Sequence, residues 1–336
     1  VVLATGSRPL ALPGNPFAGA LIDSTQALEL NTLPSSAVII GAGAVALEFA
    51  SLWNAAGCEV TLLIRKDRVL STWERRASMT LTRELKRRGV NVIARTAVDR
   101  VDTGANLGAT VHYRQGDSDE DRTAYGEVVL AAIGRVPNTD ADWFRSSGLK
   151  LDERGYVTVD GYGRTNLDGV WALGDITPGH ALAHRAFEQG ITIAEKIAGA
   201  DPKPVIDDTV PQVVFSFPEA ASVGLTLDQA KAREDVVEPK ETAYPMLSNA
   251  RMLMSGEGGS MTVVSGAFAN NPDMQVVLGV HIVSPIASDL IAEAEQLVGN
   301  RVPLADAARL IHPHPTFSET LGEALLKADG RPLHTR

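Results

Sequence analysis

The stretch AVIIGAGAVALEFASLWNAAG, from Ala37 to Gly57, decides the fold. A short apolar run leads into two glycines, and apolar residues then recur at helical spacing. Gly41 permits a tight turn, Gly43 lets a pyrophosphate approach the backbone, and the small Ala46 lets the helix pack closely on the strand. The helix N-terminus offers free N–H groups to phosphates. The stretch therefore predicts a dinucleotide-binding unit, and a tight turn that binds nothing is the alternative.

The segments that follow alternate between strand and helix patterns. This β-α-β-α-β order predicts a parallel sheet with right-handed crossovers. Residues 107–125 then predict a hairpin with an acidic tip. The segments in chain order are strand 59–64, helix 75–89, strand 90–94, the hairpin and a returning strand at 127–134.

The second half of the chain contains two further sequence patterns, a second strand–turn–helix unit and then a series of alternating strands. GVWALGDI, residues 169–176, predicts a strand ending in a glycine-bearing turn, and residues 180–199 predict the helix after it. From about residue 204, alternating segments predict an antiparallel sheet with helices. We expect an α/β protein with two Rossmann-like nucleotide-binding domains and a C-terminal α+β domain. The predicted boundaries are 1–33 with 137–205, then 34–136, and finally 206–336.

Bulk properties narrow the class of protein. The 336 residues carry a formal net charge of −10, which argues against nucleic acid or an anionic membrane as partner. No apolar run approaches the ~18–20 residues that span a bilayer. The single cysteine, Cys58, excludes an internal disulfide framework and fits a cytoplasmic location. The chain opens without methionine inside a strand-like run, so we expect a further N-terminal portion.

Four residues are candidates for contacts with bound nucleotides. The strand at 59–64 is followed by Arg65 and Lys66, whose charge favours the 2′-phosphate of NADP; both could equally be solvated surface residues. Glu48, on the predicted helix, either faces the nicotinamide or is solvated. Asp175, just past the end of a strand, is placed to accept a hydrogen bond from a ribityl or ribose hydroxyl, with a helix cap or turn role as the alternative.

Five motifs occur in one order: ATGSRP at 4–9, GAGAVALE at 41–48, AIGRVPN at 132–138, GVWALGD at 169–175 and HPHPTFSE at 312–319. Together they resemble the FAD-dependent pyridine nucleotide–disulfide oxidoreductases over essentially the whole chain. The resemblance implies an FAD domain, an inserted NAD(P)H domain and a dimerisation domain. It also implies cofactor contacts from a set of positions, namely Thr5, Gly6, Gly41, Gly43, Ala46, Glu48, Arg65, Gly134, Asp175, Ala183 and His184.

The same resemblance assigns chemistry to the last motif. It implies that His314 is a general acid/base acting at the active site of the other subunit and that Glu319 orients it. A thiol with a pKa near ~8.5 is mostly protonated at neutral pH, so an imidazole must take or return its proton. The carboxylate fixes the tautomer, and the prolines at 313 and 315 stiffen the backbone. His312 is interpreted as structural, and no metal site is expected.

Within the family, the additional histidine of HPHPT, two positions before His314, and the segment GVHIVSPIASDLIAEA most resemble the dihydrolipoyl dehydrogenases. The expected substrate is a small-molecule or lipoyl-domain dithiol or disulfide, the expected cofactors are FAD and NAD or NADP, and a homodimer and a 2-oxoacid dehydrogenase complex are the expected partners. Arg65 favours NADP as the dinucleotide, and an NADPH-dependent reductase of another disulfide, similar to the glutathione reductases, is an alternative. A non-catalytic nucleotide-binding and dimerisation module is the third alternative.

The family's CxxxxC pair and first FAD glycine motif do not occur in these residues. The predicted helix ends at Gly57, and Cys58 is the next residue. We interpret Cys58 as a small buried hydrophobic residue. We expect the missing elements in the N-terminal portion. The 336 residues by themselves are not expected to turn over disulfides.

Overall fold

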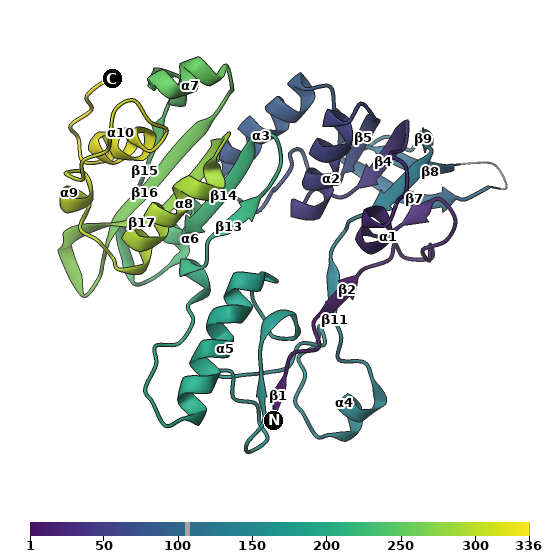
Figure 1. The fold of residues 1–336 in the computed structure, drawn as a ribbon, viewed down its shortest axis with the longest axis horizontal. Coiled ribbons are helices and arrows are strands. Elements are labelled where there is room, and N and C mark those ends of the chain that lie inside the picture. The colour runs from purple at the N-terminus through teal and green to yellow at the C-terminus, as the bar shows by residue number, and fades with distance from the viewer. Residues whose placement is uncertain (105–107, 336) are drawn as a thin grey trace. The chain divides into compact units, whose positions relative to one another are not determined.

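The computed structural model describes residues 1–104 and 108–335 (Figure 1). These residues divide into two compact units. One comprises Val1–Leu10 with Gly134–Val210, and the other comprises Ala11–Ile133 with Pro211–Arg336. Each unit is therefore built from segments that are far apart in the sequence.

A five-stranded parallel sheet forms the first part of the larger unit, in the order β3-β10-β4-β5-β6. Most residues of its central strands are buried, which explains their apolar runs. The predicted parallel sheet and its returning strand are confirmed. The strands are β3 (Leu21–Ile22), β4 (Ser36–Ile40), β5 (Glu59–Ile64), β6 (Asn91–Ala94) and β10 (Val128–Ala131).

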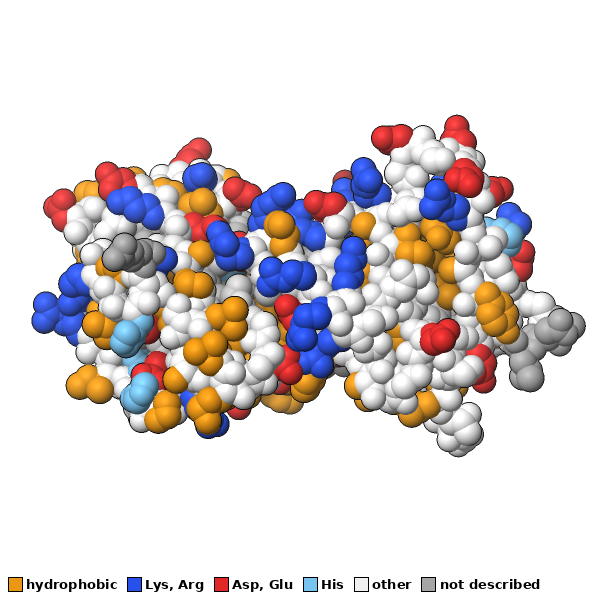
Figure 2. Space-filling view, turned by 90° about the horizontal axis from the view of Figure 1, so that it is seen from above, with side chains coloured by type: hydrophobic (Ala, Val, Ile, Leu, Met, Phe, Trp, Pro, Cys, Tyr) orange, Lys and Arg blue, Asp and Glu red, His pale blue; other side chains and the backbone are white. Residues whose placement is uncertain are grey.

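Three helices accompany this sheet: α1 (Ser24–Leu28), α2 (Ala44–Ala55) and α3 (Arg75–Arg87). Leu47 of α2 and Leu81 of α3 are fully buried in the same hydrophobic core as Ile39 and Leu62 of the sheet. The outer side of α3 is basic, and Figure 2 shows Lys and Arg side chains gathered across the middle of one face of the molecule. The helix predicted at 75–89 is thus confirmed, with its end at Arg87, and it is amphipathic.

A separate three-stranded antiparallel sheet packs beside the parallel one. It is formed by β7 (Thr96–Asp102), β8 (Ala109–Gln115) and β9 (Arg122–Gly126). The last two strands form the predicted hairpin, of which residue 107 lies outside the described residues. β7 was not predicted, because its burial alternates irregularly along the strand.

The second part of the larger unit is a five-stranded antiparallel sheet in the order β13-β14-β17-β16-β15. Apolar residues of α8 and α10 share a hydrophobic core with this sheet. The predicted α+β architecture is confirmed. The elements are β13 (Gln212–Val214), β14 (Glu219–Gly224), α6 (Leu227–Ala232), β15 (Val236–Tyr244), α7 (Ala250–Ser255), β16 (Ser260–Phe268), β17 (Asn271–Ser284), α8 (Ala287–Gly299), α9 (Leu304–Ala307) and α10 (Glu319–Ala328).

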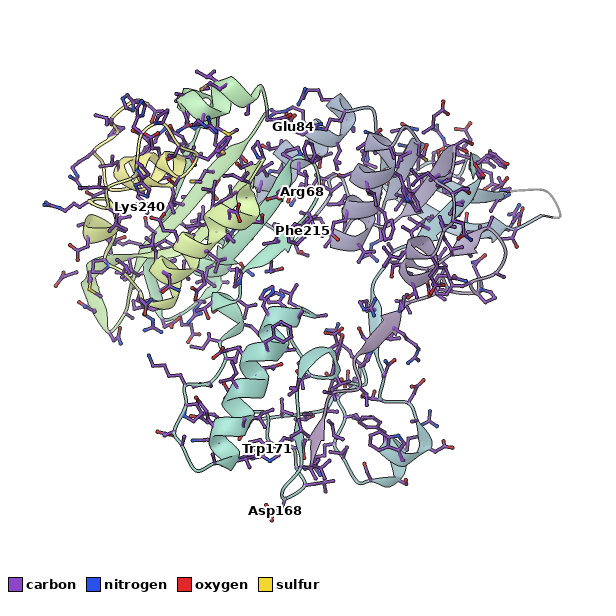
Figure 3. The ribbon with its side chains drawn as sticks, viewed as in Figure 1. Arg68, Glu84, Asp168, Trp171, Phe215 and Lys240 are labelled. Atoms are coloured by element: carbon purple, nitrogen blue, oxygen red, sulfur yellow. The ribbon has the colours of Figure 1, made fainter. Side chains whose placement is uncertain are left out.

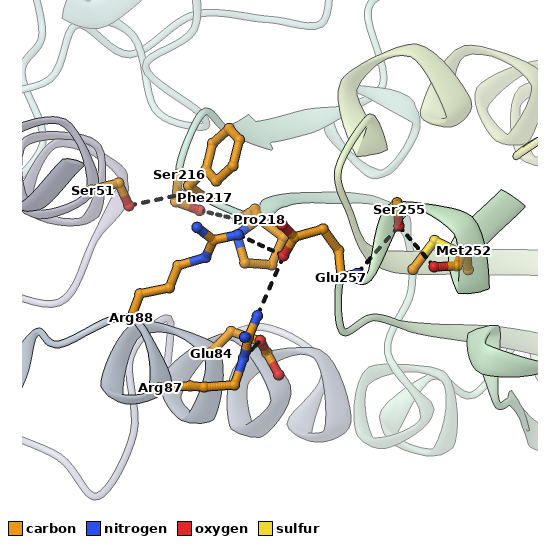
Figure 4. A network of polar contacts seen from close by, with 10 residues as sticks. All are labelled: Ser51, Glu84, Arg87, Arg88, Ser216, Phe217, Pro218, Met252, Ser255 and Glu257. Carbon is orange, nitrogen blue, oxygen red and sulfur yellow. Dashed lines mark hydrogen bonds and ion pairs between the residues drawn. The ribbon is translucent and has the colours of Figure 1, made fainter.

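Polar contacts join the two parts of the larger unit (Figure 4). Glu257, after α7, accepts hydrogen bonds from Arg87 at 3.3 Å and Arg88 at 2.5 Å. The Arg88 guanidinium also lies over the Phe217 ring, 4.6 Å from its centroid, and the Phe217 N–H donates to Ser51 of α2. Since Glu257 is partly buried, these pairs hold α3 against the antiparallel part more firmly than exposed pairs would.

The smaller unit contains short elements around one long helix, α5 (Ala183–Ile197). Its strands pair across the chain: β1 with β12 in parallel and β2 with β11 antiparallel. Within GRVPN, Arg135–Pro137 form strand β11, which pairs with Ser7–Pro9 of β2. The elements are β1 (Val2–Leu3), β2 (Ser7–Pro9), β11 (Arg135–Pro137), α4 (Asp142–Ser146), β12 (Trp171–Ala172) and the 3₁₀ turn η1 (Gly174–Ile176).

The two compact units differ in two respects from the domains that the sequence predicts. Residues 11–33 belong to the larger unit, because Leu21 and Ile22 extend its parallel sheet. Most of the predicted second and third domains, from residue 34 to Ile133 and from Pro211 onward, also falls within that one unit. The boundaries at 33, 136 and 205 stay predictions. Across the residues described, no helix has the length and apolar character needed to cross a bilayer.

Candidate functional site

The glycine turn between β4 and α2 has the features that a pyrophosphate site requires. Gly41 has φ +142°, and a Cβ there would lie 2.2 Å from the Ala132 carbonyl oxygen, so only glycine fits. Gly43 is the N-cap of α2 and gives it no side-chain cap, and a Cβ at Gly43 would meet nothing within 4 Å. Ala46 is fully buried. Open space therefore lies in front of uncapped N–H groups, which suits a phosphate.

The cations predicted to select the dinucleotide lie at the carboxyl end of β5. Strands β4 and β5 pair in parallel, with Ile40 opposite Leu63, so this end lies beside the glycine turn. Arg65 and Lys66 are both exposed, and neither side chain has a hydrogen bond or ion pair within the described part of the chain. Asp67, in contrast, is paired with Arg68 at 3.0 Å. Two unpaired cations are available to a phosphate.

Glu48 lies in the second turn of α2 and is half-buried. One carboxylate oxygen accepts the backbone N–H of Phe215 at 3.0 Å. Phe215 follows β13, its side chain is 64% exposed, and Figure 3 labels it. Glu48 is thus held by the antiparallel part of the unit and is not a freely solvated helical residue.

In the smaller unit, Asp175 is connected to the first motif of the chain. Ser7 Oγ donates to Asp175 Oδ2 at 2.5 Å, and Arg135 Nε donates to Ser7 Oγ at 2.6 Å. Oδ1 of Asp175 has no hydrogen-bond partner among the described residues. The carboxylate is therefore oriented by one oxygen and keeps the other as an acceptor for a hydroxyl, which fits the ribityl chain of a flavin.

The remaining predicted flavin contacts come from the same unit. Thr5 Oγ1 donates to the Asn138 carbonyl oxygen at 2.8 Å, Asn138 Nδ2 donates back to the Thr5 carbonyl, and the Asn138 N–H donates to Gly6. Gly134 has φ +142° and its carbonyl accepts the Leu10 N–H. These contacts join the first and third motifs of the chain.

Ala183 and His184 form the first turn of α5, whose N-cap, Leu182, offers no side-chain hydrogen bond. Further along α5, the Gln189 side chain accepts a hydrogen bond from the Gly174 N–H at 2.9 Å. This contact fixes η1, and with it Asp175, against the helix. An uncapped helix end and a carboxylate with a spare oxygen lie in one unit. Both features fit an FAD-binding domain.

The last motif forms a carboxylate–imidazole pair. His314 Nδ1 lies 2.8 Å from Glu319 Oε1, and Glu319 Oε2 accepts the Thr316 N–H at 2.8 Å. Partial burial acts to raise the pKa of Glu319, but the Thr316 N–H and the His314 ring outweigh it and lower that pKa below its ordinary value. A carboxylate acceptor makes Nδ1 the donor, which leaves Nε2 as the basic nitrogen of the neutral ring.

The exposure of this pair differs between its members. The His314 side chain is 72% exposed, whereas that of Glu319 is 20% exposed at the start of α10. Nε2 of His314 has no hydrogen bond within the described residues. The imidazole is thus oriented from inside the protein and open to a reactant from outside.

Cys58 is buried, and burial raises the pKa of its thiol to about 11, with smaller contributions from Glu127 and Glu59. A thiol of this kind is not a nucleophile at neutral pH. The interpretation of Cys58 as a small hydrophobic residue of the core is confirmed.

Comparisons with known proteins agree with these features. Residues 1–190 match the family "Pyridine nucleotide-disulphide oxidoreductase", and residues 210–325 match the dimerisation domain of that family. The chain belongs to the pyridine nucleotide-disulphide oxidoreductase family. The predicted family is confirmed, and with it the oxidoreductase class, the cofactors FAD and NAD(P), the fold class and a dimerisation domain.

Curated relatives include the dihydrolipoyl dehydrogenases of Cupriavidus necator and Geobacillus stearothermophilus. Each is 37% identical and aligned over 99% of this chain and 69% of the relative. Among solved structures, LpdA from Mycobacterium tuberculosis superposes with a TM-score of 0.85 at 29% identity, over 97% of this chain and 69% of that one. The flavoprotein disulfide reductase RclA from Escherichia coli has a TM-score of 0.83 at 24% identity, over 96% of this chain and 72% of that one, and shares the fold.

Sequence reasoning missed several residues that hold the candidate sites in place. Ser7 and Arg135 orient Asp175, and Asn138 joins two motifs. All three residues lie inside the motifs quoted above. Their polar side chains were therefore a signal from which these roles could have been predicted. The Phe215 N–H on Glu48 is a backbone group and gives no sequence signal.

Proposed function

We propose that this chain acts in a flavoprotein of the dihydrolipoyl dehydrogenase type, which moves reducing equivalents between a dithiol or disulfide substrate and NAD(P). The observation that carries the proposal is the His314–Glu319 pair, with one imidazole nitrogen held by a carboxylate and the other exposed. The dihydrolipoyl dehydrogenase relatives, aligned over 99% of the chain, support the same substrate class.

The geometry of His314 supports its proposed role as a general acid/base. Nε2 takes the proton from a substrate thiol and returns it in the reverse direction, because a thiol with a pKa near ~8.5 attacks sulfur only as the thiolate. Glu319 holds the Nδ1–H and stabilises the imidazolium that forms. FAD, when bound, supplies electron transfer between the nicotinamide and the sulfur chemistry.

Cofactor binding is proposed on the residues already described. Gly41, Gly43 and Ala46 would hold the nicotinamide dinucleotide at the N-terminus of α2, with Glu48 towards the nicotinamide and Arg65 towards the adenosine phosphate. In the smaller unit the flavin contacts would come from Thr5, Gly6, Gly134, Asp175, Ala183 and His184. The predicted boundaries at 33, 136 and 205 belong to the same proposal.

We assign the redox-active cysteine pair of the proposed enzyme to another part of the protein, since Cys58, the one cysteine of these 336 residues, is buried and its thiol pKa is raised. The dimerisation domain supports a homodimer, and we place His314 opposite the cysteine pair of the other subunit. A cytoplasmic location and service to a 2-oxoacid dehydrogenase complex complete the proposal.

The test replaces His314 with Gln in the full-length enzyme loaded with FAD. We expect dihydrolipoamide-dependent reduction of NAD⁺ or NADP⁺ to fall by about 10²–10⁴-fold, as for loss of a general acid/base, with the flavin absorbance retained. His334→Gln is the matched control, because His334 also pairs through Nδ1 with a glutamate of α10 but lies in the C-terminal segment. Equal turnover in His314→Gln and His334→Gln would refute the role.

The substrate is tested separately. We expect free lipoamide and a lipoyl domain to be turned over faster than glutathione disulfide, each assayed with NADH and NADPH. A preference for glutathione disulfide with NADPH would favour a glutathione reductase-like enzyme. Flavin binding with no turnover of any disulfide would favour a non-catalytic module.

A further inference from the structure

His312, two residues before His314, makes a second carboxylate–imidazole pair. Its Nε2 lies 3.0 Å from Glu293 Oε1 of α8. The two histidines differ sharply in exposure, since the His312 side chain is 10% exposed and that of His314 is 72% exposed. One ring of the HPHPT segment is therefore buried in the protein, and the other projects from it.

The His312 ring also fits against α10. A Cβ built on Gly322 would lie 2.4 Å from His312 Nδ1 and 2.8 Å from its Cε1, so a glycine is needed for the ring to occupy this place. Glu293 holds the ring from α8 and Gly322 admits it beside α10. The ring thus connects two helices that pack on the antiparallel sheet.

The segment that carries His314 has few other attachments. Asn249 Nδ2 donates to the Thr316 carbonyl at 3.0 Å, and Glu319 accepts the Thr316 N–H. Both contacts lie on the C-terminal side of His314. On the N-terminal side, the His312 ring packs beside Gly322 of α10, and among the described residues its hydrogen bond with Glu293 is the side-chain hydrogen bond that joins this segment to α8.

We propose that His312 and Glu293 are positioning residues, which hold the N-terminal side of the HPHPT segment so that His314 stays aligned with Glu319 and presents Nε2 to the thiol. This inference rests on the proposed role of His314. Neither residue touches the reacting atoms. Pro313 lies between the two histidines, and its ring fixes the backbone angle φ. We therefore expect a shift of the His312 ring to be passed on to the backbone of His314.

The experiment compares variants of the full-length, FAD-loaded enzyme with dihydrolipoamide as substrate. Glu293→Ala and His312→Leu remove the contact, and we expect kcat to fall about 10–100-fold with KM within about threefold of wild type, as for a misplaced catalytic group. Glu293→Gln keeps an acceptor for the Nε2–H and should restore kcat to within about threefold of wild type. Glu295→Ala, on the same helix, should behave as wild type, because its carboxylate contacts Gln296.

Two further measurements separate positioning from loss of folding. The double variant Glu293→Ala/His312→Leu should be no slower than either single variant, because the two residues act through one contact. Reduction of an artificial electron acceptor by NADH or NADPH through the flavin bypasses the thiol step and should be unchanged in all of these variants.

The outcomes distinguish the positioning role of His312 and Glu293 from the proposed general acid/base role of His314. If His314→Gln is severely slowed while Glu293→Ala and His312→Leu keep wild-type kcat, the positioning role is wrong and the general acid/base stands. If His314→Gln is as active as wild type, the proposed function fails first. A multiplicative loss in the double variant, or a loss of the artificial-acceptor activity, would also overturn the positioning role.

Discussion

Glu319 Oε1 lies 2.8 Å from His314 Nδ1, and the second oxygen of the same carboxylate accepts the N–H of Thr316. Glu319 thus fixes both the ring and the backbone that follows it. The carboxylate sits at the first residue of α10, so the helix determines where the pair is placed.

The charge of Glu319 is expected to matter beyond its hydrogen bond. Glu319→Gln keeps an acceptor for Nδ1–H but cannot stabilise an imidazolium by charge, so we expect dihydrolipoamide turnover to fall about 10–100-fold. Glu319→Asp keeps the charge at a shorter reach and should lose less. Steady-state kcat of the full-length enzyme measures both, and a Gln variant as fast as wild type would contradict a role for the charge.

Gly322 is expected to be intolerant of a side chain. Alanine there would press its Cβ against the His312 ring, which Glu293 holds, and overpacking of this kind costs about 1–3 kcal/mol. The gain in helix propensity, roughly 1 kcal/mol, offsets part of that loss. We expect Gly322→Ala to lower the urea midpoint of unfolding.

The matched control for Gly322→Ala is Gly299→Ala at the end of α8. A Cβ there meets the Glu295 carboxylate at 3.1 Å, and that side chain is flexible and can move aside. We expect this variant to be neutral or slightly stabilised. Equal midpoints for both variants would show that the His312 ring is free to move.

Arg65 is expected to act on the choice of nicotinamide dinucleotide. It is exposed and unpaired at the end of β5 among the described residues, so it gains a partner when a 2′-phosphate binds. Arg65→Ala should lower kcat/KM for NADPH at least about tenfold relative to NADH. Lys86→Ala, in the last turn of α3, removes another exposed cation and should leave the NADPH to NADH ratio unchanged. An unchanged ratio in Arg65→Ala would make Arg65 a solvated surface residue.

Cys58 is expected to resist alkylation in the folded protein. Its thiol pKa of about 11 and its burial leave almost no accessible thiolate at pH 7.5. Peptide mass spectrometry after treatment with iodoacetamide should find Cys58 unmodified in native protein and modified in 6 M guanidinium, roughly the range that unfolds stable proteins. Rapid native labelling would show that the residue is exposed.

The sequence predicts the parts of this molecule that carry local signals. The strand, glycine turn and helix at residues 36–55 follow from periodicity and from the need for glycine at Gly41. The two-residue strand β3 and the strand β7 were missed, because pairing with β10 and β8 stabilises them and their own sequences are too short or too irregular to show it.

The same limit applies to the sites. His314 and Glu319 are five residues apart, so one motif contains the pair. Ser7 and Asp175 are 168 residues apart and His312 and Glu293 are 19 apart, and neither spacing marks them as partners. Such contacts depend on how the strands and helices pack and are found only in the folded chain.

The last prediction concerns the pH dependence of the pair that holds His312. The hydrogen bond to Glu293 raises the pKa of His312 against the opposing effect of burial, with further support from the charges of Glu293 and Glu319 and from the Leu310 carbonyl. Because the folded pKa lies above the unfolded value of about 6.5, the stabilisation is complete below that pH and is lost as pH rises through the folded pKa.

Glu293→Ala removes the main cause of the raised pKa. We therefore expect the Tm difference between wild type and this variant to be larger at pH 5.5 than at pH 8.5, with a charge-assisted hydrogen bond of about 1–3 kcal/mol setting the scale. Differential scanning calorimetry of the full-length protein at the two pH values measures this Tm difference. Glu295→Ala is the control, and its Tm difference from wild type should not change with pH. A gap that widens towards pH 8.5 would mean that the His312 ring is held neutral, and the charged pair would be the wrong description.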